Sequence, residues 1–68
     1  MTNKTVKEMM IEKAEIEIEQ NKILFDFYGK LVVEEADKEL ANKYVIKQAQ
    51  IKSTLEFNQK FVDYVKSL

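Results

Sequence analysis

Residues 13–22 have the sequence KAEIEIEQNK, and the fold of the chain depends on the structure of this stretch. Ala14, Ile16 and Ile18 alternate with glutamates, and a period of two is typical of a half-buried β-strand. A longer apolar series at a spacing of seven passes through the same stretch: Ile11, Ile18, Phe25 and Val32. That spacing predicts one face of a long amphipathic helix instead.

The surrounding sequence favours the helix. Proline and glycine are the strong helix breakers, and the chain has no proline and only one glycine. Opposite charges four residues apart support a helix along the whole chain: Lys13–Glu17, Asp26–Lys30, Glu34–Lys38, Glu39–Lys43 and Glu56–Lys60. The alternative is a β-hairpin around residues 14–27 that packs on a long C-terminal helix. That hairpin lacks the Asn-Gly or Asp-Gly turn signal.

The second half of the chain predicts another amphipathic helix. Its apolar residues share one broad face: Leu40, Ala41, Tyr44, Ile51, Leu55, Phe61, Val62, Val65 and Leu68. Thr5 and Glu8 form a capping-box pattern that can begin the first helix, and Asp37 can cap the second. The side of the helix on which the apolar residues fall changes between residues 33 and 39, which predicts a turn there. Gly29 is the alternative end of the first helix.

These patterns predict a single all-α domain over residues 1–68, an antiparallel two-helix hairpin. The first helix is expected at about residues 5–33, the turn at about 33–39 and the second helix at about 39–67. Both helices carry more apolar surface than one shared seam can bury. We therefore expect a homodimer that forms an antiparallel four-helix bundle. The residues expected at an interface with a second copy or another partner are Ile16, Ile23, Phe27, Ile51, Phe57 and Tyr64.

The composition argues against catalysis and against a bound metal or cofactor. The chain has no cysteine, histidine or arginine, so it lacks the usual nucleophile, general base and bidentate anion ligand. Glutamates are frequent, but di-metal helical bundles combine glutamate with a Glu-x-x-His motif. A lone glycine forms no phosphate-binding loop. We expect a protein that is not an enzyme and that needs no cofactor.

The charged residues offer two candidate binding surfaces. An acidic stripe with no compensating lysine before Lys22 can dock a basic partner: Glu8, Glu12, Glu15 and Glu19. In the second half, three lysines at spacings of fourteen could follow nucleic-acid phosphates: Lys38, Lys52 and Lys66. The net charge of −1 and the absence of arginine count against nucleic acid. Charged side chains on both stretches also simply keep exposed helical faces soluble.

The sequence thus favours a small, non-catalytic regulatory module that binds another protein. The alternatives are an RNA- or DNA-binding helical dimer that uses the second-helix lysines, and a purely structural self-assembly element. No apolar run approaches the roughly 20 residues of a membrane span, and residues 1–10 contain no signal-peptide pattern. We expect a cytoplasmic protein.

Overall fold

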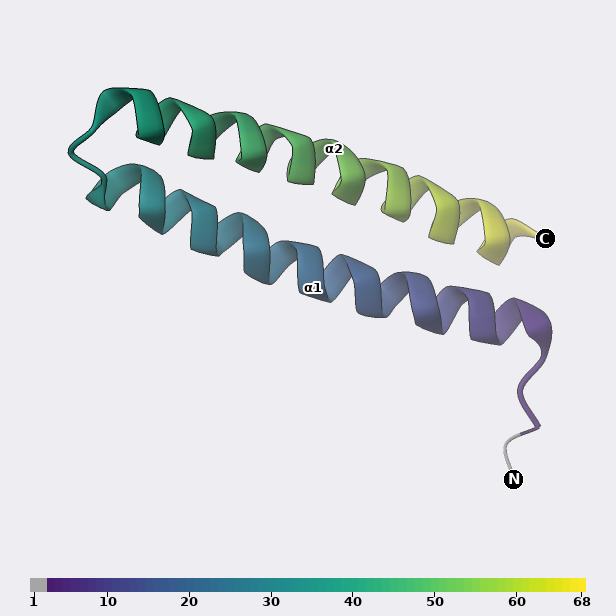
Figure 1. The fold of residues 1–68 in the computed structure, drawn as a ribbon. Coiled ribbons are helices and arrows are strands. Elements are labelled where there is room, and N and C mark those ends of the chain that lie inside the picture. The colour runs from purple at the N-terminus through teal and green to yellow at the C-terminus, as the bar shows by residue number, and fades with distance from the viewer. Residues whose placement is uncertain (1–2) are drawn as a thin grey trace.

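The computed structural model describes residues 3–68, which form two antiparallel α-helices joined by a short turn (Figure 1). Helix α1 spans Val6–Glu34 and helix α2 spans Lys38–Ser67. The start of α1 and the end of α2 lie at the same end of the hairpin, opposite the turn. The expected all-α hairpin is confirmed. Over residues 3–68 there is no strand, so the β-hairpin alternative at residues 14–27 is wrong.

The stretch KAEIEIEQNK is helical, and its apolar residues lie on two different sides of the helix. Ala14 and Ile18, four residues apart, are both buried, whereas Ile16 between them is exposed. A strand would place all three side chains on one face. In the helix, Ala14 and Ile18 instead pack with Val62 of α2 in the hydrophobic core. The helix also satisfies its own backbone hydrogen bonds without a partner strand.

Two side chains define where the helices begin. The Thr5 hydroxyl accepts a hydrogen bond from the Glu8 amide at 3.1 Å, which caps α1. The Asp37 carboxylate accepts from the amides of Glu39 at 2.9 Å and Leu40 at 3.4 Å, which caps α2. Residues 35–37 form the turn between these helices. Capping oxygens satisfy amides that have no partner within the helix, which stabilises both helix starts.

Gly29 is not at the turn but inside α1, where a side chain of α2 lies close to it. The Gln48 Nε2 atom donates a hydrogen bond to the Phe25 carbonyl at 3.2 Å. A Cβ atom at position 29 would lie 2.9 Å from that same Nε2 atom. The missing side chain of Gly29 therefore gives Gln48 room to cross the helix seam.

The hydrophobic core is a narrow seam between the helices. Its buried apolar residues are Ala14, Ile18, Ile51, Val62 and Val65, and Val62 is the most buried at 1% exposure. Ile11, Leu55 and Phe61 pack against the cluster that Ala14, Ile18 and Val62 form. Nearer the turn, the rings of Tyr28 and Tyr44 lie 6.0 Å apart across the seam. Leu68 was expected on the buried face but is exposed, because it follows the last residue of α2.

The hairpin is elongated and exposes much surface for its mass. Its radius of gyration is 15.8 Å, whereas a compact domain of this length would have about 11 Å. Its accessible surface is 5591 Å², whereas a compact monomer of 8.0 kDa would expose about 4,450 Å². The excess of about 1,100 Å² exceeds the roughly 800 Å² that one partner buries in a standard protein–protein interface.

Candidate interaction surfaces

One broad side of the hairpin is charged. Its hollow is lined from α1 by Glu15, Ile18, Glu19 and Lys22, and from α2 by Gln59, Val62 and Lys66. We call this side the charged face. The Lys66 ammonium lies 3.9 Å from the Glu15 carboxylate here, so acidic and basic side chains of the two helices compensate one another. A face of this composition is suited to contact with water.

The opposite broad side, which we call the groove face, is largely apolar. Its hollow is lined by Met10, Lys13, Ala14, Glu17, Phe57, Asn58 and Phe61. Phe57 is 70% exposed at the rim of this hollow, and Phe61 packs down against the core. Met10, Glu17 and Leu24 recur at a spacing of seven, so Leu24 extends the same side of α1 toward the turn. Met10 and Leu24 are both exposed.

A third surface lies on the outer side of α1. We call it the outer ridge, and it consists of Met9, Ile16, Ile23 and Phe27, all at least half exposed. Ile16 is two residues from the buried Ile18, which at about 100° per residue places it about 160° away around the helix axis. The outer ridge therefore faces away from α2.

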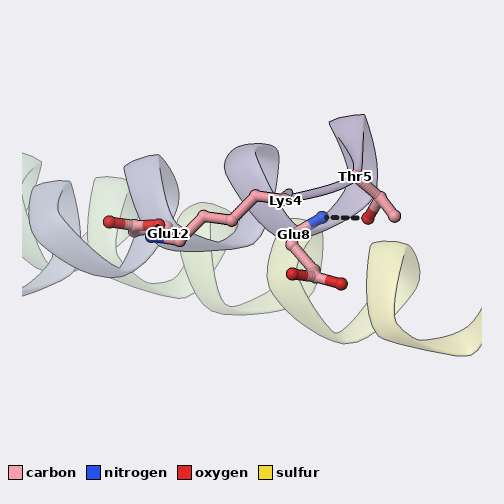
Figure 2. A network of polar contacts seen from close by, with 4 residues as sticks. All are labelled: Lys4, Thr5, Glu8 and Glu12. Atoms are coloured by element: carbon pink, nitrogen blue, oxygen red, sulfur yellow. Dashed lines mark hydrogen bonds and ion pairs between the residues drawn. The ribbon is translucent and has the colours of Figure 1, made fainter. Parts of the chain in front are cut away.

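The acidic stripe borders the outer ridge. Glu8, Glu12, Glu15 and Glu19 line one hollow together with Lys4, Ile11 and Ile16. Figure 2 shows the Lys4 side chain extending along the first turns of α1 to pair with Glu12. The expectation that the stripe has no compensating lysine before Lys22 was wrong, because Lys4 reaches Glu12 and Lys66 reaches Glu15. The flexible Lys4 side chain and the second helix supply charges that sequence spacing does not reveal.

The six residues expected at an interface do not form one patch. Ile16, Ile23 and Phe27 belong to the outer ridge. Phe57 lies at the rim of the groove face, whereas Tyr64 lies about 160° from the buried Val62 around α2, and both are exposed. Ile51 is only 8% exposed and belongs to the seam, so it is not accessible to another chain.

Sequence reasoning left Met10, Leu24 and Phe61 out of the candidate interface. Met10 and Leu24 lie fourteen residues apart, which puts them on one side of α1 and was a usable signal for a second stripe there. What it does not reveal is that this stripe faces the same side of the hairpin as Phe57 and Phe61, because that depends on how α1 and α2 are rotated against each other.

The three candidate nucleic-acid lysines all lie on α2 and are exposed: Lys38, Lys52 and Lys66. Each step of fourteen residues rotates the side chain by about 40° around the helix, so the row winds slowly across α2. Lys66, at one end of it, lies in the hollow that also contains Glu15 and Glu19. These carboxylates reduce the positive potential that a phosphate would meet there. Binding of nucleic acid stays a prediction.

Over residues 3–68 no three acidic side chains converge on a point that could hold a metal ion. In the same part of the chain, neither helix contains a sufficiently long apolar segment to span a membrane. Comparisons of the chain with family models, curated proteins and solved structures give no match. The candidate interaction sites are the groove face and the outer ridge, because both expose large apolar side chains.

Proposed function

We propose that this chain is a non-catalytic, regulatory interaction module that acts by binding another protein, and that two copies first pair through their groove faces. The observation that carries this proposal is the exposed apolar surface. Among the described residues thirteen large apolar side chains are exposed and only five apolar residues are buried. Soluble monomers rarely leave contiguous apolar patches of more than a few hundred Å² open to water.

The geometry of a closed bundle favours the groove face as the self-interface. In a four-helix bundle each helix contacts two neighbours, in directions about 90° apart around its axis. Met10 and Glu17 lie about 80° and 100° from Ile18 around α1, so the groove face has the required direction. The outer ridge lies about 160° from Ile18 and would stay outside such a bundle.

Sedimentation equilibrium over a range of concentrations tests the pairing. We expect the wild-type chain to have twice the 8.0 kDa mass of one chain. Phe57→Glu places a charge on the groove face and should yield monomers, because an unpaired charge would have to lose its water in the interface. Val33→Glu is the matched control: Val33 is 85% exposed and borders a hollow with Asp26 and Glu34, away from the groove face. A single-chain mass for the wild type at every concentration would contradict the pairing.

Binding to a different protein needs its own test. Affinity capture of the tagged chain from a lysate of its own source, with and without nuclease, should recover a stoichiometric protein in both cases. Capture of RNA or DNA that disappears with nuclease would instead favour the nucleic-acid alternative. Recovery of the chain alone, in assemblies larger than a dimer, would favour self-assembly.

A further inference from the structure

The outer ridge remains open even after the hairpins pair as proposed above, and the inference drawn here rests on that proposed function. Met9, Ile16 and Ile23 recur at a spacing of seven, and Phe27 follows four residues later. This is the spacing of positions that meet a second helix in a coiled coil. Phe27 lies eighteen positions after Met9, so the ridge extends over about 27 Å of helix. Its shape therefore suits one straight helix of about five turns.

The charges beside the ridge indicate which side chains a partner helix would need. Glu12 and Glu19 lie about 40° and 60° from Ile16 around α1, close enough to flank a helix that packs on the ridge. Glu8 and Glu15 extend the same acidic border along the hollow. Lys4 compensates Glu12 and Lys66 approaches Glu15, whereas Glu8 and Glu19 have no such ion pair with any of residues 3–68. Lys13 lines the other side of the ridge with Met9 and Ile16, so the ridge is acidic along one border only. A complementary helix would carry lysine or arginine along that acidic border.

A second copy of α1 does not meet this requirement. In an antiparallel pair centred on the ridge, the two-fold axis would pass near residue 18 and bring Glu19 against Glu19 of the copy. In a parallel pair the acidic border of one helix would lie beside the opposite border of the copy, and Lys13, which lines the ridge with Met9 and Ile16, would approach Lys13 of the copy. Like charges in register are destabilising in both arrangements. The partner is therefore a different chain.

We propose that the outer ridge is a docking site for a basic amphipathic helix of another protein. The partner helix places apolar residues at heptad spacing on Met9, Ile16, Ile23 and Phe27, and its basic residues along the acidic border. Because the ridge and the groove face are on different sides of the hairpin, one dimer would offer two such docking sites.

Two synthetic peptides test this site. One is a helix of about three heptads with leucines at the contact positions and lysines at the flanking positions. Its twin has glutamates in place of those lysines. Each fluorescently labelled peptide is titrated with the full chain, and binding is followed by anisotropy. We expect saturable binding of the lysine peptide at one peptide per chain, at least about tenfold tighter than that of its twin, and weaker binding at high salt.

Three variants locate the binding. Ile23→Asp should weaken binding of the lysine peptide at least about tenfold, because the substitution buries a charge in the contact. Ile23 is 63% exposed, so the fold should tolerate the change, and circular dichroism verifies this. Phe57→Glu is the control on the groove face and should leave peptide binding unchanged. Combined Glu12→Lys and Glu19→Lys substitutions should reverse the preference between the twin peptides.

The results separate this inference from the proposed function. Equal binding of both peptides, no saturable binding at all, or no effect of Ile23→Asp would overturn the docking site. If the sedimentation mass still shows a dimer in that case, the proposed pairing stands without it. If Ile23→Asp lowers the sedimentation mass and Phe57→Glu does not, the ridge is the self-interface, and both the docking site and the groove-face pairing are wrong.

Discussion

The contact between Gln48 and Gly29 predicts how the substitution Gly29→Ala changes the free energy of unfolding. Gly29 is an interior residue of α1, where alanine should stabilise a helix by about 1 kcal/mol over glycine. A Cβ atom there would approach Gln48 Nε2 to 2.9 Å, so the amide has to move. Because that atom ends a flexible side chain, it can do so at the cost of its hydrogen bond to the Phe25 carbonyl.

The magnitude follows from these two opposing effects. A typical hydrogen bond contributes about 0.5–1.5 kcal/mol net. The α-helical pattern already supplies the Phe25 carbonyl with the Gly29 amide as donor, which favours the low end of that range. We therefore expect Gly29→Ala alone to stabilise the protein by about 0.5 kcal/mol or less. In a Gln48→Ala background, where no amide has to move, the same change should yield the full gain of about 1 kcal/mol.

Urea unfolding followed by circular dichroism measures all four proteins of this cycle at one fixed protein concentration, because dimerisation would otherwise shift the apparent stability. Gln50→Ala is the matched control background: Gln50 is exposed, so its removal should leave the effect of Gly29→Ala unchanged. An equal gain in the wild-type and Gln48→Ala backgrounds would refute the contact between residues 29 and 48. A loss of stability in both would refute the placement of Gly29 inside a helix.

Three further predictions test the core, the turn and the lysine row. Val62→Ala should destabilise the chain by about 2 kcal/mol through lost burial and an unfilled cavity, whereas Val33→Ala at an exposed position should be nearly neutral in the same urea titration. Asp37→Ala should cost about 1 kcal/mol because the amides of the first turn of α2 lose their acceptor, and Asp37→Ser should recover most of the thermal midpoint. The third prediction replaces Lys38, Lys52 and Lys66 with glutamine, which should leave the sedimentation mass unchanged. If the nucleic-acid alternative is right, the same replacement should abolish retention of a labelled RNA in a gel-shift assay.

The local signals in the sequence proved sufficient for the fold. Thr5 and Asp37 cap the helices through hydrogen bonds to amides two or three residues away, so their role is encoded within one turn. The spacing of seven from Ile11 to Phe25 marks the side of α1 that faces α2, and Ile18 at its centre is buried. Such features depend on helix geometry alone, which fixes side-chain directions relative to one another along a single helix.

The candidate surfaces could be only partly inferred in the same way. Exposed apolar residues on α1 and α2 were recognisable, but Ile51 was assigned to an interface although it lies in the seam. Lys66 and Glu15 lie fifty-one residues apart in the sequence, and only the packing of the helices brings them to 3.9 Å. Contacts of this kind depend on the rotation and axial shift of one helix against the other, and neither is visible in the periodicity of a single helix.

The sequence by itself determined that the chain forms two amphipathic helices and that each has more apolar surface than one seam can bury. The reason is local, since residue spacing on a helix of known pitch decides which side chains share a face. Only the tertiary structure decided how those faces combine. It places Met10 of α1 beside Phe57 and Phe61 of α2 on one broad side and directs Ile16 and Ile23 away from the hairpin. The two apolar surfaces therefore lie on different sides of the hairpin, the groove face about 80–100° and the outer ridge about 160° from Ile18 around α1.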